Sequence, residues 1–181
     1  MGPADHPRRG TGTAASPSPV GGLPPVAPRS PVAVRPPAAP PCLYVVVTYV
    51  PRRTTVTVGS LGPVPFERGW YAYVGSAARA RRARVARHLA AEKPLRWHAD
   101  YLFTAFPPRR AWLVDGAAGE CELASELAAL PSAARRPLRF GAGDCRCPGH
   151  LVRFPRRPCR AEVSTAAGPG ARVRAFRRSA G

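Results

Sequence analysis

Apolar residues occur along the chain in short runs, and proline or glycine separates most of these runs. Residues 43–50 form a dense run of β-branched and aromatic side chains between Pro41 and Pro51, which predicts a buried strand. Residues 54–58 alternate between polar and apolar, as a half-exposed strand does, and residues 70–74 predict a third strand. We expect these three strands to form an antiparallel meander.

Two later patterns are typical of helices. Residues 77–91 are mostly strong helix formers and follow Ser76, a suitable N-cap. Val85 and Leu89 stand four positions apart and would share one face of this helix. Residues 120–130 predict a second helix with a stripe of leucines on its inner side. These leucines are Leu123, Leu127 and Leu130.

Residues 111–114 and 150–154 predict two more strands, of which the second would close the sheet. Together the patterns predict an α+β fold, with a small central, mostly antiparallel sheet flanked by helices. Residues 97–102 allow two interpretations: His98 and Asp100 add metal-binding or proton-transfer groups to a site, or one of them caps a short helix. In the second case the core is filled by Trp97, Tyr101 and Leu102.

Composition divides the chain into three parts. Residues 1–41 are rich in Pro, Gly, Ser and Ala, and they lack the apolar surface that would offset the entropy of ordering. We expect a disordered Pro/Arg-rich arm there. Residues 156–181 are again rich in Arg, Pro, Gly and Ala and predict a basic flexible tail. The folded domain is therefore expected at residues 42–155.

The 181 residues carry a net charge of +18, and Lys93 is the single lysine among 28 basic residues. A positive field of this size attracts polyanions, and the planar guanidinium suits phosphate oxygens. We expect a nucleic acid as the partner, although biased codon usage would produce the same excess of arginine. The charge does not distinguish DNA from RNA, and the sequence leaves the oligomeric state open.

No apolar run reaches the roughly 18 residues of a membrane span, and the N-terminal region lacks the apolar core of a secretory signal. We expect a cytoplasmic protein that does not contact a membrane. In a reducing compartment the five cysteines would be thiols or metal ligands rather than structural disulfides.

Soft metal ligands gather near the end of the predicted domain. Cys145, Cys147 and His150 lie within six positions, and Cys121 or His98 could complete a tetrahedral Zn²⁺ site. Two alternatives remain open. Cys121 could face the core while the other two cysteines are ordinary loop thiols, or these two could form a reactive pair.

Four ordered motifs resemble the GIY-YIG nuclease superfamily and its Uri-type branch. Tyr44 lies on the first predicted strand, and Tyr73-Val74-Gly75 ends the third. Arg84 and His88 follow on the first predicted helix, and a glutamate opens the second. The longer runs that carry the resemblance are residues 70–77, 97–102, 120–124 and 144–151.

The resemblance implies a divalent-metal-dependent endonuclease that hydrolyses phosphodiester bonds in DNA or RNA with Mg²⁺ or Mn²⁺ and without a small-molecule cofactor. Tyr44 would be the general base or would orient the attacking water, and Tyr73 would support the nucleophile or the phosphate. Arg84 would stabilise charge on the phosphoryl oxygens, and Glu120 would hold the metal. His88 completes the catalytic set.

Substrate contacts are expected from Gly75, Ser76, Arg87 and His98. Glu122 is the alternative metal ligand, but the apolar pair at residues 123–124 follows Glu120 at the spacing of the family. The chain departs from the family pattern where Cys42-Leu43 replaces Gly-Ile and Val74 replaces Ile. The loop between the two tyrosine motifs is also longer, and the late asparagine of the family has no clear equivalent.

Two other hypotheses use the same residues. A nucleic-acid-binding module would keep the fold and the basic surface without turnover, and a zinc-stabilised interaction domain would use the cysteine cluster. Strand tyrosines, a solvated basic helix face and a glutamate that complements a helix dipole would account for the pattern without catalysis. Loss of activity in EDTA would separate the nuclease from a binding module.

Overall fold

The apolar run at Leu43–Val50 forms β1, the central strand of the computed structural model, which describes residues 42–177. β1 pairs antiparallel with β4 (Gly69–Ser76) on one side and with β5 (Arg110–Asp115) on the other. The full sheet has the order β6-β7-β4-β1-β5-β8, and its neighbouring strands are antiparallel throughout. The outer strands are β6 (Ala134–Arg135), β7 (Leu151–Phe154) and β8 (Arg172–Ala175).

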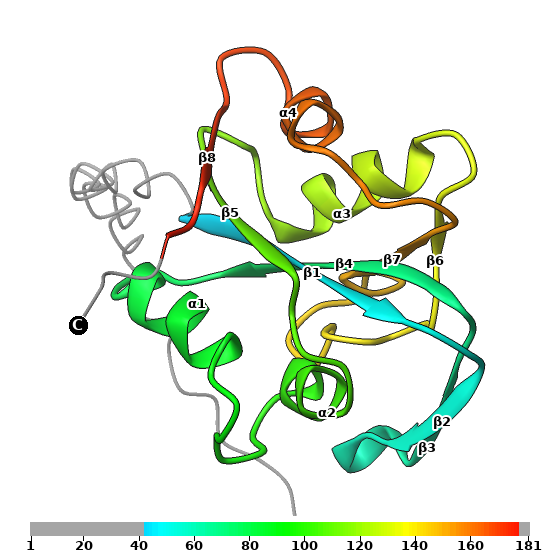
Figure 1. The fold of residues 1–181 in the computed structure, drawn as a ribbon. Helices are drawn as coiled ribbons and strands as arrows, with labels where there is room; N and C mark the ends of the chain where they lie inside the picture. Colours follow the sequence, from blue (N-terminus) through cyan, green and yellow to red (C-terminus); the bar gives the residue numbers. More distant parts are fainter. Residues whose placement is uncertain (1–41, 178–181) are drawn as a thin grey trace, which may run out of the picture. The chain divides into compact units, whose positions relative to one another are not determined.

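Helices cover both faces of this sheet, as Figure 1 shows. Below it in that view lie α1 (Arg81–His88) and α2 (His98–Ala105), and above it lie α3 (Glu120–Ala129) and α4 (Arg160–Ala167). The predicted α+β class with a central antiparallel sheet is confirmed.

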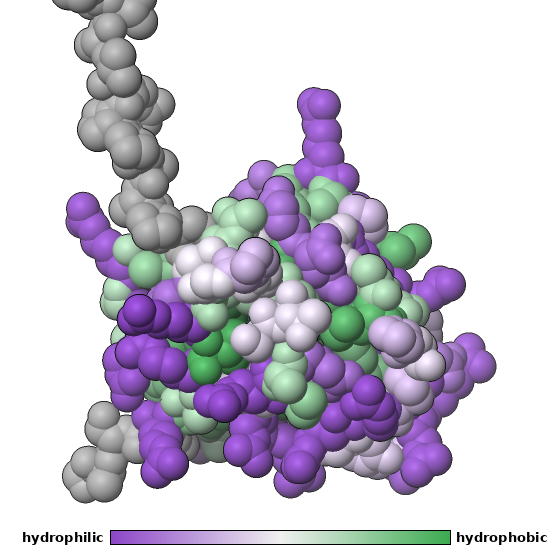
Figure 2. Space-filling model, turned by 90° about the horizontal axis from the view of Figure 1, so that it is seen from above, coloured by the Kyte–Doolittle hydropathy of each residue, from purple (hydrophilic) through white to green (hydrophobic). Residues whose placement is uncertain are grey.

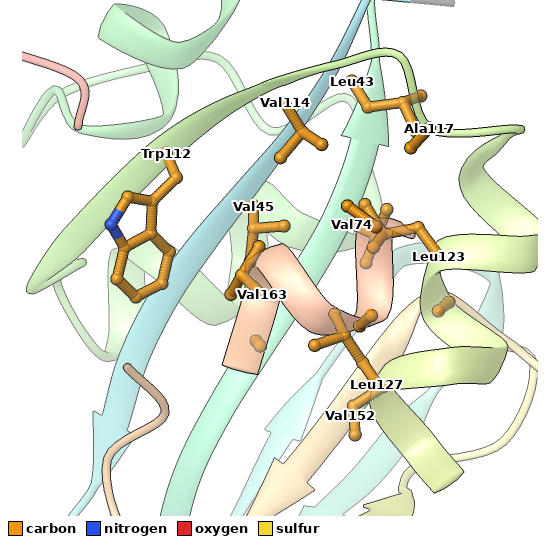
Figure 3. Packing of buried hydrophobic residues seen from close by; sticks show 14 of the residues in the cluster. Leu43, Val45, Val74, Trp112, Val114, Ala117, Leu123, Leu127, Val152 and Val163 are labelled. Atoms are coloured by element: carbon orange, nitrogen blue, oxygen red, sulfur yellow. The ribbon is translucent and has the colours of Figure 1, made fainter. Parts of the chain in front are cut away.

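Successive side chains of β1 point to opposite faces, so this strand contributes to two apolar cores. Leu43 and Val45 belong to the core between the sheet and the helices α3 and α4. Figure 3 shows Val45 there together with Val163 of α4. Tyr44 and Val46 belong to the core between the sheet and the helices α1 and α2. Because helices cover both faces, β1 is apolar along most of its length instead of alternating with polar residues.

The first half of the chain is not the meander that the sequence predicts. β2 (Thr54–Thr57) pairs with β3 (Pro63–Phe66) in a separate two-stranded sheet, and β1 pairs directly with β4. A short 3-10 helix, η1 (Gly59–Leu61), lies between β2 and β3. The prediction is wrong because residues 63–66, despite two prolines, bury Val64 and Phe66 against the core and form a strand of their own.

The first helix begins at Arg81, later than the sequence predicts. Ser76 is not its N-cap but the last residue of β4, and the N–H of Ala77 still donates to the carbonyl of Cys42 at 3.0 Å. The strand ladder therefore holds the backbone extended at this point. Ala80, in the left-handed conformation with φ 53°, turns the chain into α1.

The C-terminal region is folded, so the prediction of a flexible tail at residues 156–181 is wrong for the segment that carries α4 and β8. Val163 packs into the core above the sheet, and Val173 of β8 extends the same core next to β5. The carboxylate of Glu162 accepts the backbone N–H of Cys159 at 2.8 Å, which fixes the start of α4. A small apolar face and a capping glutamate are enough to form α4, despite the surrounding arginines.

The outer surface above the sheet is mixed in polarity. Seen from above, hydrophilic side chains occupy most of the rim of the surface, and less polar ones lie nearer its middle (Figure 2). None of the helices that the structure describes is long and apolar enough to span a membrane. The predicted arm at residues 1–41, like residues 178–181, lies outside the described part of the chain.

Candidate active site

A pocket of about 280 Å³ opens where β1, β4, α1 and the start of α3 meet the loop before β7. Residues far apart in the sequence line it. Six of them are site residues that the sequence predicts: Tyr44, Tyr73, Ser76, Arg84, His98 and Glu120. Two phenols, a guanidinium and a carboxylate therefore share one pocket.

The pairing of β1 with β4 brings the two tyrosines together. Tyr44 stands opposite Gly75 in the ladder, and its ring centroid lies 6.5 Å from that of Tyr73. Burial raises the pKa of Tyr73 well above its ordinary value. A side chain at Gly75 would collide with the ring and hydroxyl of Tyr44, so Gly75 makes room for the phenol. It is not among the residues that line the pocket, and its role as a substrate contact stays a prediction.

A buried histidine lies behind Tyr44. The Tyr44 hydroxyl is 3.0 Å from Nε2 of His88, which is only 1% exposed. Burial raises the pKa of Tyr44 above its usual range, and the positive charge of Arg84 opposes this shift. Burial lowers the pKa of His88, so its ring is neutral at pH 7. His88 therefore reaches the site through Tyr44 and not through the pocket itself.

Arg84 enters the pocket from α1, one helical turn before His88. Its Nη1 donates to the carbonyl of Ser76 at 2.9 Å, and its guanidinium carbon lies 4.8 Å from the ring centroid of Trp97. A guanidinium has five N–H donors. These contacts hold the cation in place and leave most of its donors for a ligand.

Arg87, predicted to bind substrate, is engaged within the protein instead. Its Nη1 and Nη2 form a bidentate ion pair with the carboxylate of Asp100 at 2.8 and 3.0 Å. Nη2 also donates to the carbonyl of Pro94 at 2.6 Å. The pair has a clear physical reason: Asp100 is 0% exposed, and a buried carboxylate needs a cation.

Asp100 also begins α2. Its Oδ2 accepts the backbone N–H groups of Arg96 and Trp97, each at 2.9 Å, so the capping interpretation of residues 97–102 is confirmed for Asp100. Burial alone would raise the pKa of this carboxyl, but the neighbouring His88 ring and the hydrogen bonds from Arg87 and the two amides outweigh it and lower the pKa. The expectation that Trp97 fills the core is wrong, since Trp97 is 38% exposed and lines the pocket.

His98 lines the pocket from the first turn of α2. Its Nδ1 accepts the backbone N–H of Gly141 at 3.1 Å, so in the neutral ring the proton is on Nε2. Burial lowers the pKa of His98, which favours that neutral ring. The Nε2–H group could donate a hydrogen bond to a phosphate oxygen in the pocket.

Of the two candidate metal-binding carboxylates, Glu120 lies at the pocket. Its side chain is 30% exposed, and among the described residues it has no lysine or arginine partner; its Oε2 lies 4.0 Å from Nδ1 of His150. Glu122 instead turns back over Gly119, where its carboxylate fills the space of a Cβ. The position of Glu120 at the start of α3 suits an anion, because the helix dipole is positive there.

Three thiols and an imidazole converge beside Glu120. One ligand atom from each lies within 4.8 Å of all the others. The four residues are Cys121, Cys145, Cys147 and His150. The two loop sulfurs are 3.2 Å apart, and Nε2 of the histidine is 3.5 Å from the sulfurs of Cys121 and Cys145. In a tetrahedral zinc site, with bonds of about 2.0–2.3 Å, neighbouring ligand atoms stand roughly 3.5–3.8 Å apart. The cluster could therefore bind a metal ion such as zinc.

The acidity of the thiols reflects this crowding. Burial, together with the neighbouring Cys147 and Cys145, raises the pKa of Cys121 to about 12. Burial would also raise the pKa of Cys145, but hydrogen bonds from Cys147 and Cys121 and the charge of Arg139 outweigh it and lower the pKa. Three adjacent thiolates repel one another without a cation, so metal binding would release protons from the cluster.

Arg139 organises the loop that carries the two neighbouring cysteines. Its Nη1 donates to the carbonyls of Cys145 and Cys147 at 2.9 and 3.0 Å, and its Nη2 donates to the carbonyl of Ala142 at 2.7 Å. The loop also passes close to Tyr73, because a Cβ at Gly141 would come within 2.8 Å of the Tyr73 ring. Gly141 has φ 77° and permits this approach.

Comparison with protein-family models matches residues 43–171 to the family described as "Domain of unknown function DUF123". The chain belongs to the DUF123 family. The matched region runs from β1 to the loop after α4 and contains every pocket and cluster residue described above. Comparisons with curated proteins and with solved structures found no match.

Sequence reasoning missed several pocket residues of this DUF123 domain. They are Arg96, Trp97, Gly141, Gly143 and Asp144. Trp97 and Asp144 lie within the runs 97–102 and 144–151 that carry the resemblance, and Arg96 directly precedes the first of them, so their position in the sequence was the available signal. The glycines carry no reactive group, and only the backbone path of the loop brings them to the pocket.

Proposed function

We propose that this DUF123 domain is a divalent-metal-dependent endonuclease of the GIY-YIG type, which hydrolyses phosphodiester bonds in DNA or RNA. One observation carries the proposal: Tyr44, Tyr73, Arg84 and Glu120, from four separate segments, line the same pocket. A net charge of +18 further favours a polyanionic substrate.

The donor set fits Mg²⁺ or Mn²⁺. Glu120 offers hard carboxylate oxygens at the pocket, and no lysine or arginine of the described residues pairs with them. Mg²⁺ is typically held by one or two carboxylates together with water and substrate phosphate. Bound there, the ion would supply positive charge that stabilises the leaving oxygen.

The phenols and the histidine would handle the proton of the attacking water. As the water oxygen bonds to phosphorus, one of its protons passes to the Tyr44 oxygen, while the proton of Tyr44 passes to Nε2 of His88. The bond from phosphorus to the leaving oxygen breaks, and that oxygen takes a proton from solvent. Because burial raises the pKa of Tyr44, a concerted transfer avoids a free phenolate.

The other two groups act on charge and position. Arg84 faces the phosphoryl oxygens with the donors that its structural contacts leave free, and it stabilises the charge that builds up on them. The hydroxyl of Tyr73 lies beside the same site and would hold the water or a phosphate oxygen.

Plasmid nicking tests this proposal, with Mg²⁺, Mn²⁺ and EDTA compared side by side and structured RNA assayed in parallel. We expect Tyr73→Phe, Arg84→Ala and Glu120→Gln each to lower the nicking rate by about 10²-fold or more, as removal of a group that stabilises a transition state does. Matched controls are Glu122→Gln, also on α3, and Arg82→Ala, also on α1, neither of which lines the pocket. Undiminished nicking in all three site variants would remove the nuclease assignment.

The alternative is a nucleic-acid-binding module on the same fold. Its binding would weaken steadily as salt rises, because arginine contacts release counterions from the phosphates. Removal of a divalent ion from the pocket by EDTA would leave the binding of nucleic acid unchanged. Tight, salt-dependent binding without nicking under any metal condition would favour this alternative.

We propose that the metal of the cysteine cluster is Zn²⁺ in a structural role. Three sulfurs and one imidazole nitrogen make a closed four-ligand set, which is typical of structural zinc. All five cysteines are free thiols, which suits the cytoplasm that we propose for this protein. Metal analysis of protein purified without added zinc should give about one zinc per chain; a content near zero would contradict the assignment.

A further inference from the structure

We propose that Asp100 is a positioning residue that fixes the tautomer of His88 and so directs the Nε2 lone pair of that ring at Tyr44. Its catalytic consequence rests on the proposed nuclease function. The tautomer does not depend on that function, and it can be measured in a protein that cleaves nothing.

The hydrogen bonds of Asp100 leave one acceptor position open. Each oxygen of a carboxylate has two lone pairs that accept hydrogen bonds. Oδ2 accepts the N–H groups of Arg96 and Trp97 at 2.9 Å each, and it also accepts from Nη2 of Arg87 at 3.0 Å. Oδ1 accepts a single hydrogen bond, from Nη1 of Arg87 at 2.8 Å. Oδ2 thus accepts more hydrogen bonds than it has lone pairs, and the open position is the second lone pair of Oδ1.

That open position lies close to a nitrogen that lacks a partner. Nδ1 of His88 is buried and has no hydrogen-bond partner among the described residues. It lies 3.7 Å from Oδ1 of Asp100. This distance exceeds that of a good hydrogen bond, but the bonds of a catalytic relay often tighten once substrate is bound. A small movement of the ring would satisfy both groups.

The charge of Asp100 selects one of the two neutral tautomers. With the proton on Nδ1, the ring presents N–H to the carboxylate, and Nε2 accepts the hydroxyl of Tyr44 at 3.0 Å. With the proton on Nε2, a lone pair of Nδ1 would face the anionic oxygen, and the ring would donate to Tyr44 instead of accepting from it. The first arrangement is favoured electrostatically and is the one that the proton transfer requires.

Other charged groups around His88 do not replace Asp100. Arg87 and Lys93 disfavour a positive ring, whereas Asp100 favours it. The carboxylate would therefore also stabilise the imidazolium that forms when Tyr44 gives up its proton. The ionisable or charged groups that face this ring from the surrounding elements are Tyr44, Tyr73, Arg87, Lys93 and Asp100.

Capping alone does not account for the position of Asp100. A cap for α2 needs only the two backbone amides. The side chain in addition spans from α2 to α1, where its second oxygen meets both Arg87 and His88. A purely structural role predicts no defined tautomer for His88.

Long-range ¹H–¹⁵N NMR of the full-length, zinc-loaded protein tests the tautomer directly, with His88→Gln used to assign the ring signals. We expect His88 at pH 7 to be neutral, with a protonated Nδ1 and an unprotonated Nε2. A protonated Nε2 in the wild-type protein would overturn the proposal, whatever the nicking assays show.

Asp100→Asn tests the consequence. The side-chain amide introduced by this substitution can donate to Nδ1, so we expect the Nε2–H tautomer and a fall in kcat on the order of 10²–10⁴-fold with little change in KM. Asp115→Asn is the matched control, because Asp115 is also paired with arginines, Arg81 and Arg174, but on β5. This control should keep both the tautomer of His88 and kcat.

The outcomes separate the two proposals. Nδ1–H in the wild type and Nε2–H in Asp100→Asn would support the positioning role even if the protein proves to be a binder. Unchanged tautomer or unchanged kcat in a folded Asp100→Asn enzyme would overturn it. If this variant does not fold, the wild-type spectrum alone decides.

Discussion

Two groups of residues line or support the pocket, and they are built in different ways. The tyrosine wall, made of Tyr44, Tyr73, Arg84, His88 and Asp100, consists of side chains on strands and helices. Most of them are joined directly, by the Tyr44–His88 hydrogen bond and by ring packing, and Arg87 anchors Asp100. This half of the site is fixed by the same contacts that fix the fold.

The cysteine wall is made of Glu120, Asp144 and the four residues of the metal cluster. Apart from the start of α3, it is a loop that is held by Arg139 and by weak contacts between the thiols. Thiols this close gain little from one another without a metal ion. The comparison teaches that contacts within the protein hold the tyrosine wall, whereas we expect the proposed metal ion to hold the cysteine wall rigid.

Loss of zinc should therefore have the largest effect on stability, and the structural change should be confined to the cysteine wall. We expect Cys147→Ser, which removes one ligand, to lower the free energy of unfolding by more than about 5 kcal/mol, since structural zinc contributes strongly to folding. Thermal unfolding and metal analysis measure this. Cys159→Ser, outside the cluster and exposed, is the control and should keep its zinc.

The comparison also predicts which residues change their structure when zinc is lost. At temperatures where the zinc-free protein remains folded, NMR signals of Gly141 and His150 should shift or broaden, while those of His88 stay in place. Equal disturbance of both walls would contradict the division.

Asp100 should give the next largest effect, on the tyrosine wall and in acid. Its pKa is lowered in the folded protein, so its contribution to stability is complete above the ordinary pKa of 3.8 and is lost as the pH falls below it. At pH 7 we expect Asp100→Asn to cost about 3–5 kcal/mol, because Arg87 loses its buried partner.

Urea unfolding at pH 7, 5, 4 and 3 checks this. Both proteins carry the same cluster, so its own acid sensitivity cancels in the difference between them, which should shrink below about pH 4. Asp144→Asn, at an exposed position, should show no such pattern. A difference that stays constant down to pH 3 would mean that the pKa of Asp100 is not lowered in the folded state.

The strands of the tyrosine wall could be predicted from the sequence, because their pattern is local. The run that became β1 needed only β-branched and aromatic residues between prolines, and Tyr44 sits inside it. The partner of Arg87 could not be found this way. Arg87 and Asp100 lie on different helices, and in sequence Arg87 is indistinguishable from a solvated basic residue.

The cysteine wall shows the opposite balance. Its ligand set could be predicted from chemistry, because soft ligands at close spacing are rare by chance, although its loop has no regular structure. The folded C-terminal region escaped prediction because α4 buries only Val163 and small alanines among arginines. Whether so small a face is buried depends on the tertiary partner above β1, which the local pattern does not contain.

A smaller and sharper test uses two glycines at the site. Gly75→Ala should place a methyl group on the ring of Tyr44 and cost about 1–3 kcal/mol, as overpacking of a core does. Gly143→Ala, on the cysteine wall, meets nothing within 4 Å and should change stability by less than about 0.5 kcal/mol. Chemical denaturation compares them; equal costs would show that Tyr44 can move aside and that its wall is less rigid than its contacts suggest.

The smallest expected effect separates the two phenols themselves. Tyr44→Phe removes the hydroxyl that is bonded to buried His88 and should lower the free energy of unfolding by about 1 kcal/mol. Tyr73→Phe should cost less than about 0.5 kcal/mol, because Tyr73 lines the pocket and its hydroxyl, unlike that of Tyr44, makes no hydrogen bond to another described residue. Chemical denaturation of both variants measures the difference. Equal losses would mean that Tyr73 is bound as firmly as Tyr44, and a hydroxyl already held by the protein would not be free to hold a water or a phosphate oxygen.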